Sequence, residues 1–143
     1  LLNSLKNRIS IPLAILISST AFVFPHLSSL IEADFVYAVI GIINLYLVST
    51  IFSILVLWRS NIWIACGLHS AWNFILYVIM GLSLSGSESV SKGIVLFSVK
   101  DASILNGAEY GIEASVITAV VLGMLLFVMV KRWKGRISKD GIS

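Results

Sequence analysis

The chain has 143 residues, of which 58% are hydrophobic and 12% are charged, and its formal net charge is +3. Because this apolar content exceeds the roughly 45–50% of ordinary soluble domains, and a small domain cannot bury so much of it, composition excludes a water-soluble fold and predicts an integral membrane protein. The single cysteine, Cys66, excludes an internal disulfide framework and a cysteine-rich metal site.

Four apolar stretches are long enough to cross a bilayer core, which is about 30 Å thick and takes roughly 20 helical residues. They predict an all-α fold, a polytopic membrane helix bundle of about four transmembrane helices that forms a single domain over residues 1–143. The predicted spans are residues 9–30, 35–58, 61–84 and 111–130. A stretch rich in serine and glycine, Ser85 to Tyr110, is predicted to be a loop outside the membrane.

The basic residues lie at the ends of the apolar stretches and do not form a stripe interleaved with aromatic residues, so we expect no nucleic-acid partner. When the first residues are placed in the cytoplasm, only Lys92 and Lys100 of the ten Lys and Arg residues fall outside. Positive loops are retained in the cytoplasm. We therefore expect both ends of the chain to be cytoplasmic, in a bacterial cell membrane.

Both histidines lie inside predicted spans, where a charged group costs roughly 2.5 kcal/mol or more and ionisable residues are functional candidates by default. Phe22 lies four residues before His26, and Asn73 lies four residues after His69, so each pair shares one face of a helix. A neutral imidazole can bind a metal or transfer a proton, and an asparagine amide can donate to an oxyanion. The alternative for each residue is a simple hydrogen bond to a neighbouring helix.

The two histidines are predicted to lie at different depths. Counted from Ile9, His26 is 17 residues or ~26 Å along its span, whereas His69 is 9 residues or ~14 Å from Ser60. We nevertheless expect both rings to face a shared interior cavity, because imidazoles that faced lipid would leave polar nitrogens unpaired.

Other polar residues are weaker candidates for chemistry. Those of the second span are expected to form hydrogen bonds between helices; they are Asn44, Ser49, Thr50 and Ser53. Glu109 and Glu113 flank Gly111 at the outer edge of the fourth span, where exposed carboxylates are ordinary. We therefore expect neither glutamate to have a catalytic role.

The patterns F-x-x-x-H at Phe22 to His26 and H-x-x-x-N at His69 to Asn73 resemble, in order and separation, two motifs of the CAAX prenyl endopeptidase and bacteriocin-processing family of intramembrane proteases, also called CPBP or Abi. Ile62-Trp63 shortly before the last motif is similar to that family as well. The family's first motif, E-E-x-x-x-R, does not occur in the chain. Since the chain also begins at Leu1 without an initiator methionine, we expect it to be a C-terminal fragment that follows this motif.

The resemblance implies an intramembrane endopeptidase that hydrolyses a peptide bond in or near the membrane and is incomplete in this chain. In the implied mechanism a glutamate of the absent motif activates water, His26 and His69 orient that water or hold a metal such as zinc, and Asn73 steadies the oxyanion. Two histidines fall short of the three protein ligands usual for catalytic zinc. The implied partners are the lipid bilayer and a peptide or protein substrate. The alternative is a non-catalytic protein of the same scaffold, such as a bacteriocin immunity factor that acts by binding.

Overall fold

The computed structural model describes residues 1–82, 94 and 103–139, with Glu109 and residues 134–139 described by their backbone alone. Every regular element in this part of the chain is helical, which confirms the predicted all-α fold. The elements in chain order are α1 (Leu2–Leu5), α2 (Ile11–Val23), the 3-10 turn η1 (Phe24–His26), α3 (Leu27–Glu32), α4 (Phe35–Arg59), α5 (Trp63–Asn73), the π-helix η2 (Phe74–Ile79), the 3-10 turns η3 (Ala108–Tyr110) and η4 (Ile112–Ala114), and α6 (Val116–Lys139).

Three helical stretches are long and apolar enough to cross a membrane. They are Ile11–Glu32, which joins α2, η1 and α3, then Phe35–Arg59, which is α4, and Val116–Trp133 within α6. The stretch Trp63–Ile79, made of α5 and η2, is apolar but shorter, and its 17 residues reach about 26 Å. The chain is therefore a polytopic helix bundle, as its hydropathy predicts.

The last helix begins at Val116, later than the predicted start of the fourth span at Gly111. The preceding residues form η3 and η4 instead, with φ angles of +80° at Gly107 and +100° at Gly111. Such angles are open mainly to glycine, and a Cβ atom at Gly107 would overlap the carbonyl oxygen of Gly111. The two glycines therefore hold a compact turn where a longer helix was expected. Most of the loop predicted over Ser85 to Tyr110 lies outside the described residues.

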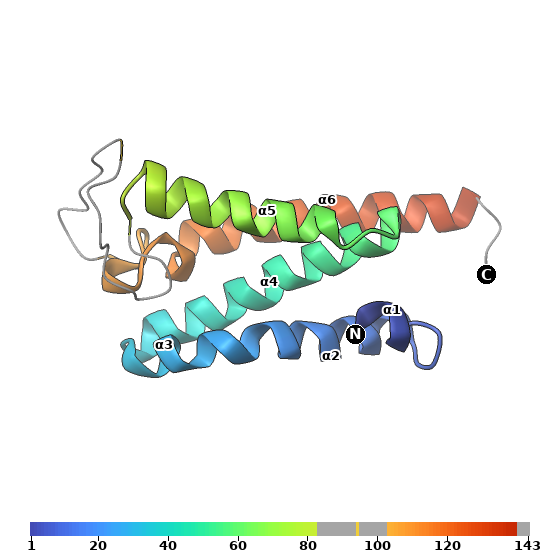
Figure 1. The fold of residues 1–143 in the computed structure, drawn as a ribbon, viewed down its shortest axis with the longest axis horizontal. Coiled ribbons are helices and arrows are strands. Elements are labelled where there is room, and N and C mark those ends of the chain that lie inside the picture. The colour runs from blue at the N-terminus through green and yellow to red at the C-terminus, as the bar shows by residue number, and fades with distance from the viewer. Residues whose placement is uncertain (83–93, 95–102, 140–143) are drawn as a thin grey trace.

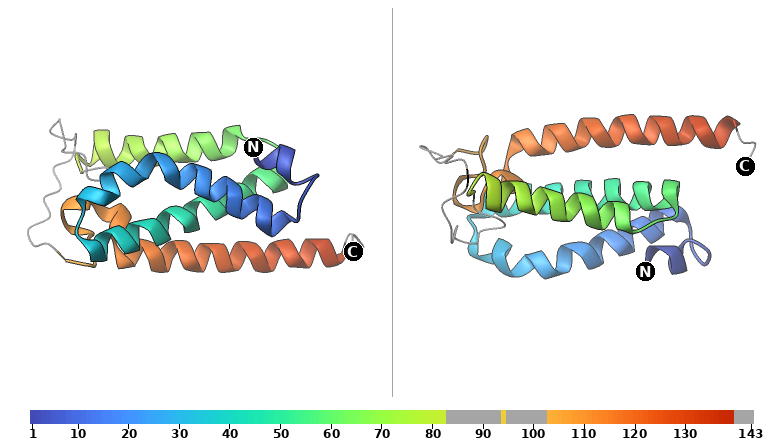
Figure 2. Two further views of the ribbon diagram at one scale, coloured as in Figure 1. Left: turned by 90° about the horizontal axis from the view of Figure 1, so that it is seen from below. Right: turned by 45° about the horizontal axis from the view of Figure 1, so that its top comes forward.

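Helix α4 is the centre of the bundle, with α2, α5 and α6 packed against it (Figures 1 and 2). The successive long helices alternate in direction, so α1 and the end of α6 lie at the same end of the molecule (Figure 1). One buried cluster joins α1, α2, α4 and α5, and another joins α4 to α6. Their members are Leu2, Ala14, Val56 and Ala65 in the first and Ile51, Ile54 and Met129 in the second.

Large apolar side chains cover the outer faces of the bundle. Phe35 is 82% exposed, Phe127 is 69% exposed and Met124 is 59% exposed. Soluble proteins seldom expose large contiguous apolar patches, whereas hydrocarbon tails are a suitable solvent for such faces. The chain is therefore an integral membrane protein.

The turn that precedes α6 is hydrogen-bonded to the middle of α4. The buried Asn44 Nδ2 donates hydrogen bonds to the carbonyl oxygens of Glu113, at 2.7 Å, and Ser115, at 3.0 Å. Gly41, one turn before Asn44, lets α3 approach closely, because a Cβ atom there would lie 2.7 Å from Leu30 Cδ2. The backbone of Glu113 therefore has a fixed position beside α4.

The expected hydrogen bonds from α4 to other segments form in part. The prediction is confirmed for Asn44, whose two bonds reach the turn before α6. It is wrong for Thr50, because its Oγ1 donates at 2.7 Å to the carbonyl oxygen of Tyr46 in the same helix. A hydroxyl on a helix can donate a hydrogen bond to the carbonyl oxygen four residues earlier, and the short threonine side chain does so here.

Candidate functional site

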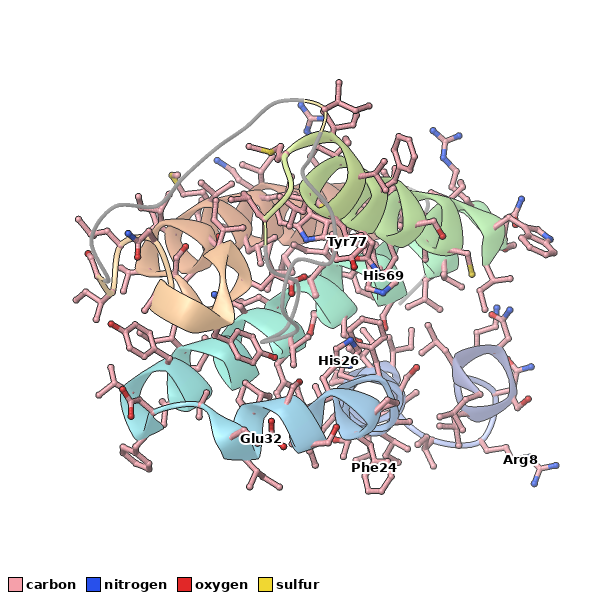
Figure 3. All side chains as sticks on the ribbon, turned by 60° about the vertical axis from the view of Figure 1, so that its left-hand side comes forward. Arg8, Phe24, His26, Glu32, His69 and Tyr77 are labelled. Atoms are coloured by element: carbon pink, nitrogen blue, oxygen red, sulfur yellow. The ribbon has the colours of Figure 1, made fainter. Side chains whose placement is uncertain are left out.

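Four rings from three parts of the bundle meet between α2, α4 and α5. The ring centres of His26 and His69 lie 6.4 Å apart, and Phe22 lies 5.2 Å from His26 and 5.5 Å from His69. Phe52 of α4 completes the group at 6.1 Å from His69. Edge-to-face contacts at such distances are favourable for aromatic rings. Figure 3 shows the two imidazoles directed toward each other from facing helices, while Phe24 points out of the bundle.

The depth difference expected from counting residues does not separate the two histidines. The turn after α4 runs back along the bundle before α5 begins, so α5 starts inward of the end of α4 (Figure 1). This stagger brings His69 to the level of His26, with their ring centres 6.4 Å apart. The rings therefore face the interior together, as the cost of exposing them to lipid predicts.

His26 stands at a break between two helices. Pro25 has no backbone N–H to donate, and residues 24–26 form the 3-10 turn η1 between α2 and α3. The Nδ1 atom of His26 lies 3.1 Å from the carbonyl oxygen of Phe22. A carbonyl oxygen can only accept, so Nδ1 carries the proton and donates it. The Nε2 atom of the neutral ring then keeps a lone pair that can accept a proton or a hydrogen bond.

His69 and Asn73 share one face of α5. The Nδ2 atom of Asn73 lies 3.5 Å from Nε2 of His69, which is a long contact in which the amide donates. Both side chains are partly buried. Directly after Asn73 the α-helix changes to the π-helix η2, a rare form that is frequent at functional sites. One N–H of the amide faces His69, and the other can serve a second acceptor.

Two residues beside the histidines were not predicted. Phe52 contacts His69 from α4, and Glu113 accepts a hydrogen bond at 3.1 Å from the indole Nε1 of Trp72, the neighbour of Asn73. An exposed carboxylate at a helix edge is ordinary in sequence, and only the fold of the turn before α6 brings it to α5.

The described residues do not by themselves fit a catalytic zinc ion. Zinc in such sites has three protein ligands and an open position. The part of the chain that the structure describes contains no group of three His, Cys, Asp or Glu side chains that could hold a metal. His26 and His69 provide two imidazoles. A zinc role for them stays a prediction, and no step of the chemistry below depends on a metal.

The arrangement combines an imidazole with a fixed tautomer, a second imidazole and an amide donor in a largely apolar bundle. Buried polar groups of this kind can orient a water molecule and donate to an oxyanion. Among the described residues, Asn73 lies beside His69, as their spacing predicts, and His26 lies beside His69, as the cost of exposing imidazoles to lipid predicts. The general base that hydrolysis needs is not part of this group.

Comparison with protein families gives a match over the part of the chain that carries the candidate site. Neither curated proteins nor solved structures give a match to the chain. The family model described as Type II CAAX prenyl endopeptidase Rce1-like matches residues 1–75, which are more than half of the chain and include both histidine motifs. The chain therefore belongs to the Rce1-like family of type II CAAX prenyl endopeptidases.

Proposed function

We propose that the protein is an intramembrane endopeptidase of the CAAX type, which hydrolyses a peptide bond in or near the membrane. The observation that carries this proposal is the 6.4 Å approach of the His26 and His69 rings from separate helices. Polar groups are used sparingly in membrane helices, and two imidazoles with an adjacent amide are more than packing requires. Family membership supports the same reading.

In the proposed reaction, a glutamate of an E-E-x-x-x-R motif removes a proton from water. The motif is not among the 143 residues, and we propose that a segment upstream of Leu1 supplies it. The water oxygen bonds to the peptide carbonyl carbon, and the carbonyl electron pair moves to its oxygen. The proton then passes from the glutamic acid to the peptide nitrogen as the C–N bond breaks.

The residues of this chain would prepare that attack. The Nε2 atom of His26, left unprotonated by the bond from Nδ1 to the Phe22 carbonyl, would accept a hydrogen bond from the water. Asn73 would donate an N–H to the oxyanion. His69, which lies beside the Asn73 amide, would hold that amide toward the reacting carbonyl. The peptide or protein substrate would enter from the bilayer or its surface.

The second candidate is a non-catalytic membrane protein on the same scaffold, such as a bacteriocin immunity factor. What favours it is that each imidazole already has a hydrogen-bond partner among the described residues, the Phe22 carbonyl for His26 and the Asn73 amide for His69. In that reading the histidines stabilise helix packing, and the protein acts by binding.

The upstream coding sequence distinguishes the two candidates. We expect an in-frame E-E-x-x-x-R motif there, and we expect the restored protein in lipid vesicles to cleave a farnesylated peptide that ends in a CAAX sequence. The 143-residue chain alone is expected to be inactive, because general-base catalysis typically contributes about 10²- to 10⁴-fold in rate. Cleavage by the short chain at the rate of the restored protein would contradict the assigned glutamate role. A restored protein without the motif and without cleavage would favour the binding protein.

We further propose that the protein lies in a bacterial cell membrane with both ends of this chain in the cytoplasm. The bias of Lys and Arg toward one side supports this orientation. In a Cys66→Ser background, Ser138→Cys is expected to react with a membrane-impermeant maleimide only after the cells are permeabilised. Labelling of Ser138→Cys in intact cells would place the C-terminal end outside the cell and contradict the proposed topology.

A further inference from the structure

The contact between Glu113 and Trp72 joins two segments that are 41 positions apart in the sequence. The indole Nε1 of Trp72 donates to Oε1 of Glu113 at 3.1 Å. Trp72 directly precedes Asn73 and lies three residues after His69, so it is on the same helical turn as both. A shift of this indole therefore moves the turn that carries the candidate site.

Helix α5 itself buries little of its surface. Its only buried residue among those described is Ala65, near its first turn. After Asn73 the helix continues as the π-helix η2, whose backbone geometry is less favourable than that of an α-helix. The ring contacts of His69 and the buried Leu76 of η2 hold this end of α5 against the bundle. The directional hydrogen bond to the side chain of Trp72 adds a constraint on where His69 and Asn73 point.

The backbone at Glu113, in contrast, is fixed by hydrogen bonds from both α4 and α6. Asn44 of α4 donates to its carbonyl oxygen at 2.7 Å, and Thr118 Oγ1 donates to the preceding carbonyl of Ile112, also at 2.7 Å. The neighbouring Ala114 is fully buried against α3 and α4. The carboxylate thus extends toward α5 from a backbone that α4 and α6 fix.

We propose that Glu113 is a positioning residue, which holds Trp72 and thereby orients His69 and Asn73 toward His26. This positioning role rests on the proposed function, because His69 and Asn73 are the residues assigned to catalysis there. The turn before α6 therefore belongs to the site, although it carries none of the family motifs.

The test compares Glu113→Ala with Glu113→Gln in the full-length protein in lipid vesicles. Misplacing a reacting group by about 1 Å can cost on the order of 10²-fold, so Glu113→Ala is expected to lower kcat by about 10- to 100-fold with little change in KM. Glutamine keeps an oxygen that accepts from the indole, and it should restore most of the activity. Glu32→Gln, an exposed carboxylate at the end of α3, is the matched control and should leave kcat unchanged.

A second measurement does not depend on proteolysis. In protein with 15N-labelled tryptophan, the indole resonance of Trp72, assigned by its loss in Trp72→Phe, should shift upfield in Glu113→Ala and much less in Glu113→Gln. If the resonance shifts but the full-length protein never cleaves peptide, the contact between Glu113 and Trp72 is confirmed and the proposed protease function is wrong. An active protein in which the resonance does not move would refute the positioning role, and so would equal losses of activity in Glu113→Ala and Glu113→Gln.

Discussion

Replacing His26 with alanine in the full-length protein is expected to lower kcat for peptide hydrolysis by about 10²-fold, the usual cost of misplacing a reacting group, here the water, by about 1 Å. The physical reason is the fixed tautomer of His26: the Phe22 carbonyl binds the Nδ1 proton at 3.1 Å, so Nε2 is left to accept from the water. Alanine removes that acceptor and leaves the helix break at Pro25 in place. His69→Ala is expected to have an effect of similar size.

The measurement is the initial rate of peptide cleavage by each variant at equal membrane level. Ser28→Ala is a matched control, because Ser28 follows His26 by two residues and its side chain is exposed. Its rate should be that of the unchanged protein. If His26→Ala and Ser28→Ala cleave equally well, His26 is a structural residue and the assigned role is wrong.

Asn73→Ala is expected to lower kcat by about 10²- to 10³-fold, as loss of one oxyanion donor does elsewhere. Its amide lies beside His69 and has a second N–H for the developing negative charge. Because this charge is present only in the transition state, KM should change little. The check is a full rate curve against substrate concentration for the variant and the unchanged protein.

The control for Asn73 is Ser70→Ala on the same helix, which removes an exposed polar group next to His69 and should have almost no effect on kcat. An Asn73→Ala variant as active as Ser70→Ala would mean that the amide serves helix packing. A rise in KM with unchanged kcat would mean that it binds the substrate uniformly and does not stabilise an oxyanion.

Three of the four predicted spans correspond to helices long and apolar enough to cross a membrane, because length and hydropathy decide such helices. A run of about 20 apolar residues has few alternatives to a spanning helix, and α4 differs from its predicted span by one residue at its end. The start of α6 is harder to predict, since Gly111, where the fourth span was predicted to begin, adopts a positive φ angle that hydropathy does not reveal. The π-helix after Asn73 has no signal in the hydrophobic pattern.

In the candidate site, too, some features can be predicted from the sequence and others depend on how the helices pack. His26, His69 and Asn73 can be predicted because polar residues in an apolar span are rare and their spacing of four residues places them on one face. Their common depth depends on the stagger of α5, which helix counting does not include. Glu113 and Trp72 are 41 positions apart in the sequence. They meet only because the turn before α6 packs on α4. Local patterns contain no information about this packing.

Hydrolysis in water enriched in 18O tests the central claim most directly. The full-length protein in lipid vesicles would be incubated with a farnesylated CAAX peptide, and the products would be weighed by mass spectrometry. The proposed reaction predicts one 18O atom in the new carboxyl group and no product above background for the variant with both His26→Ala and His69→Ala. If that variant forms the labelled product at the unchanged rate while present at normal membrane level, the two histidines, whose rings lie 6.4 Å apart, do not form the catalytic site.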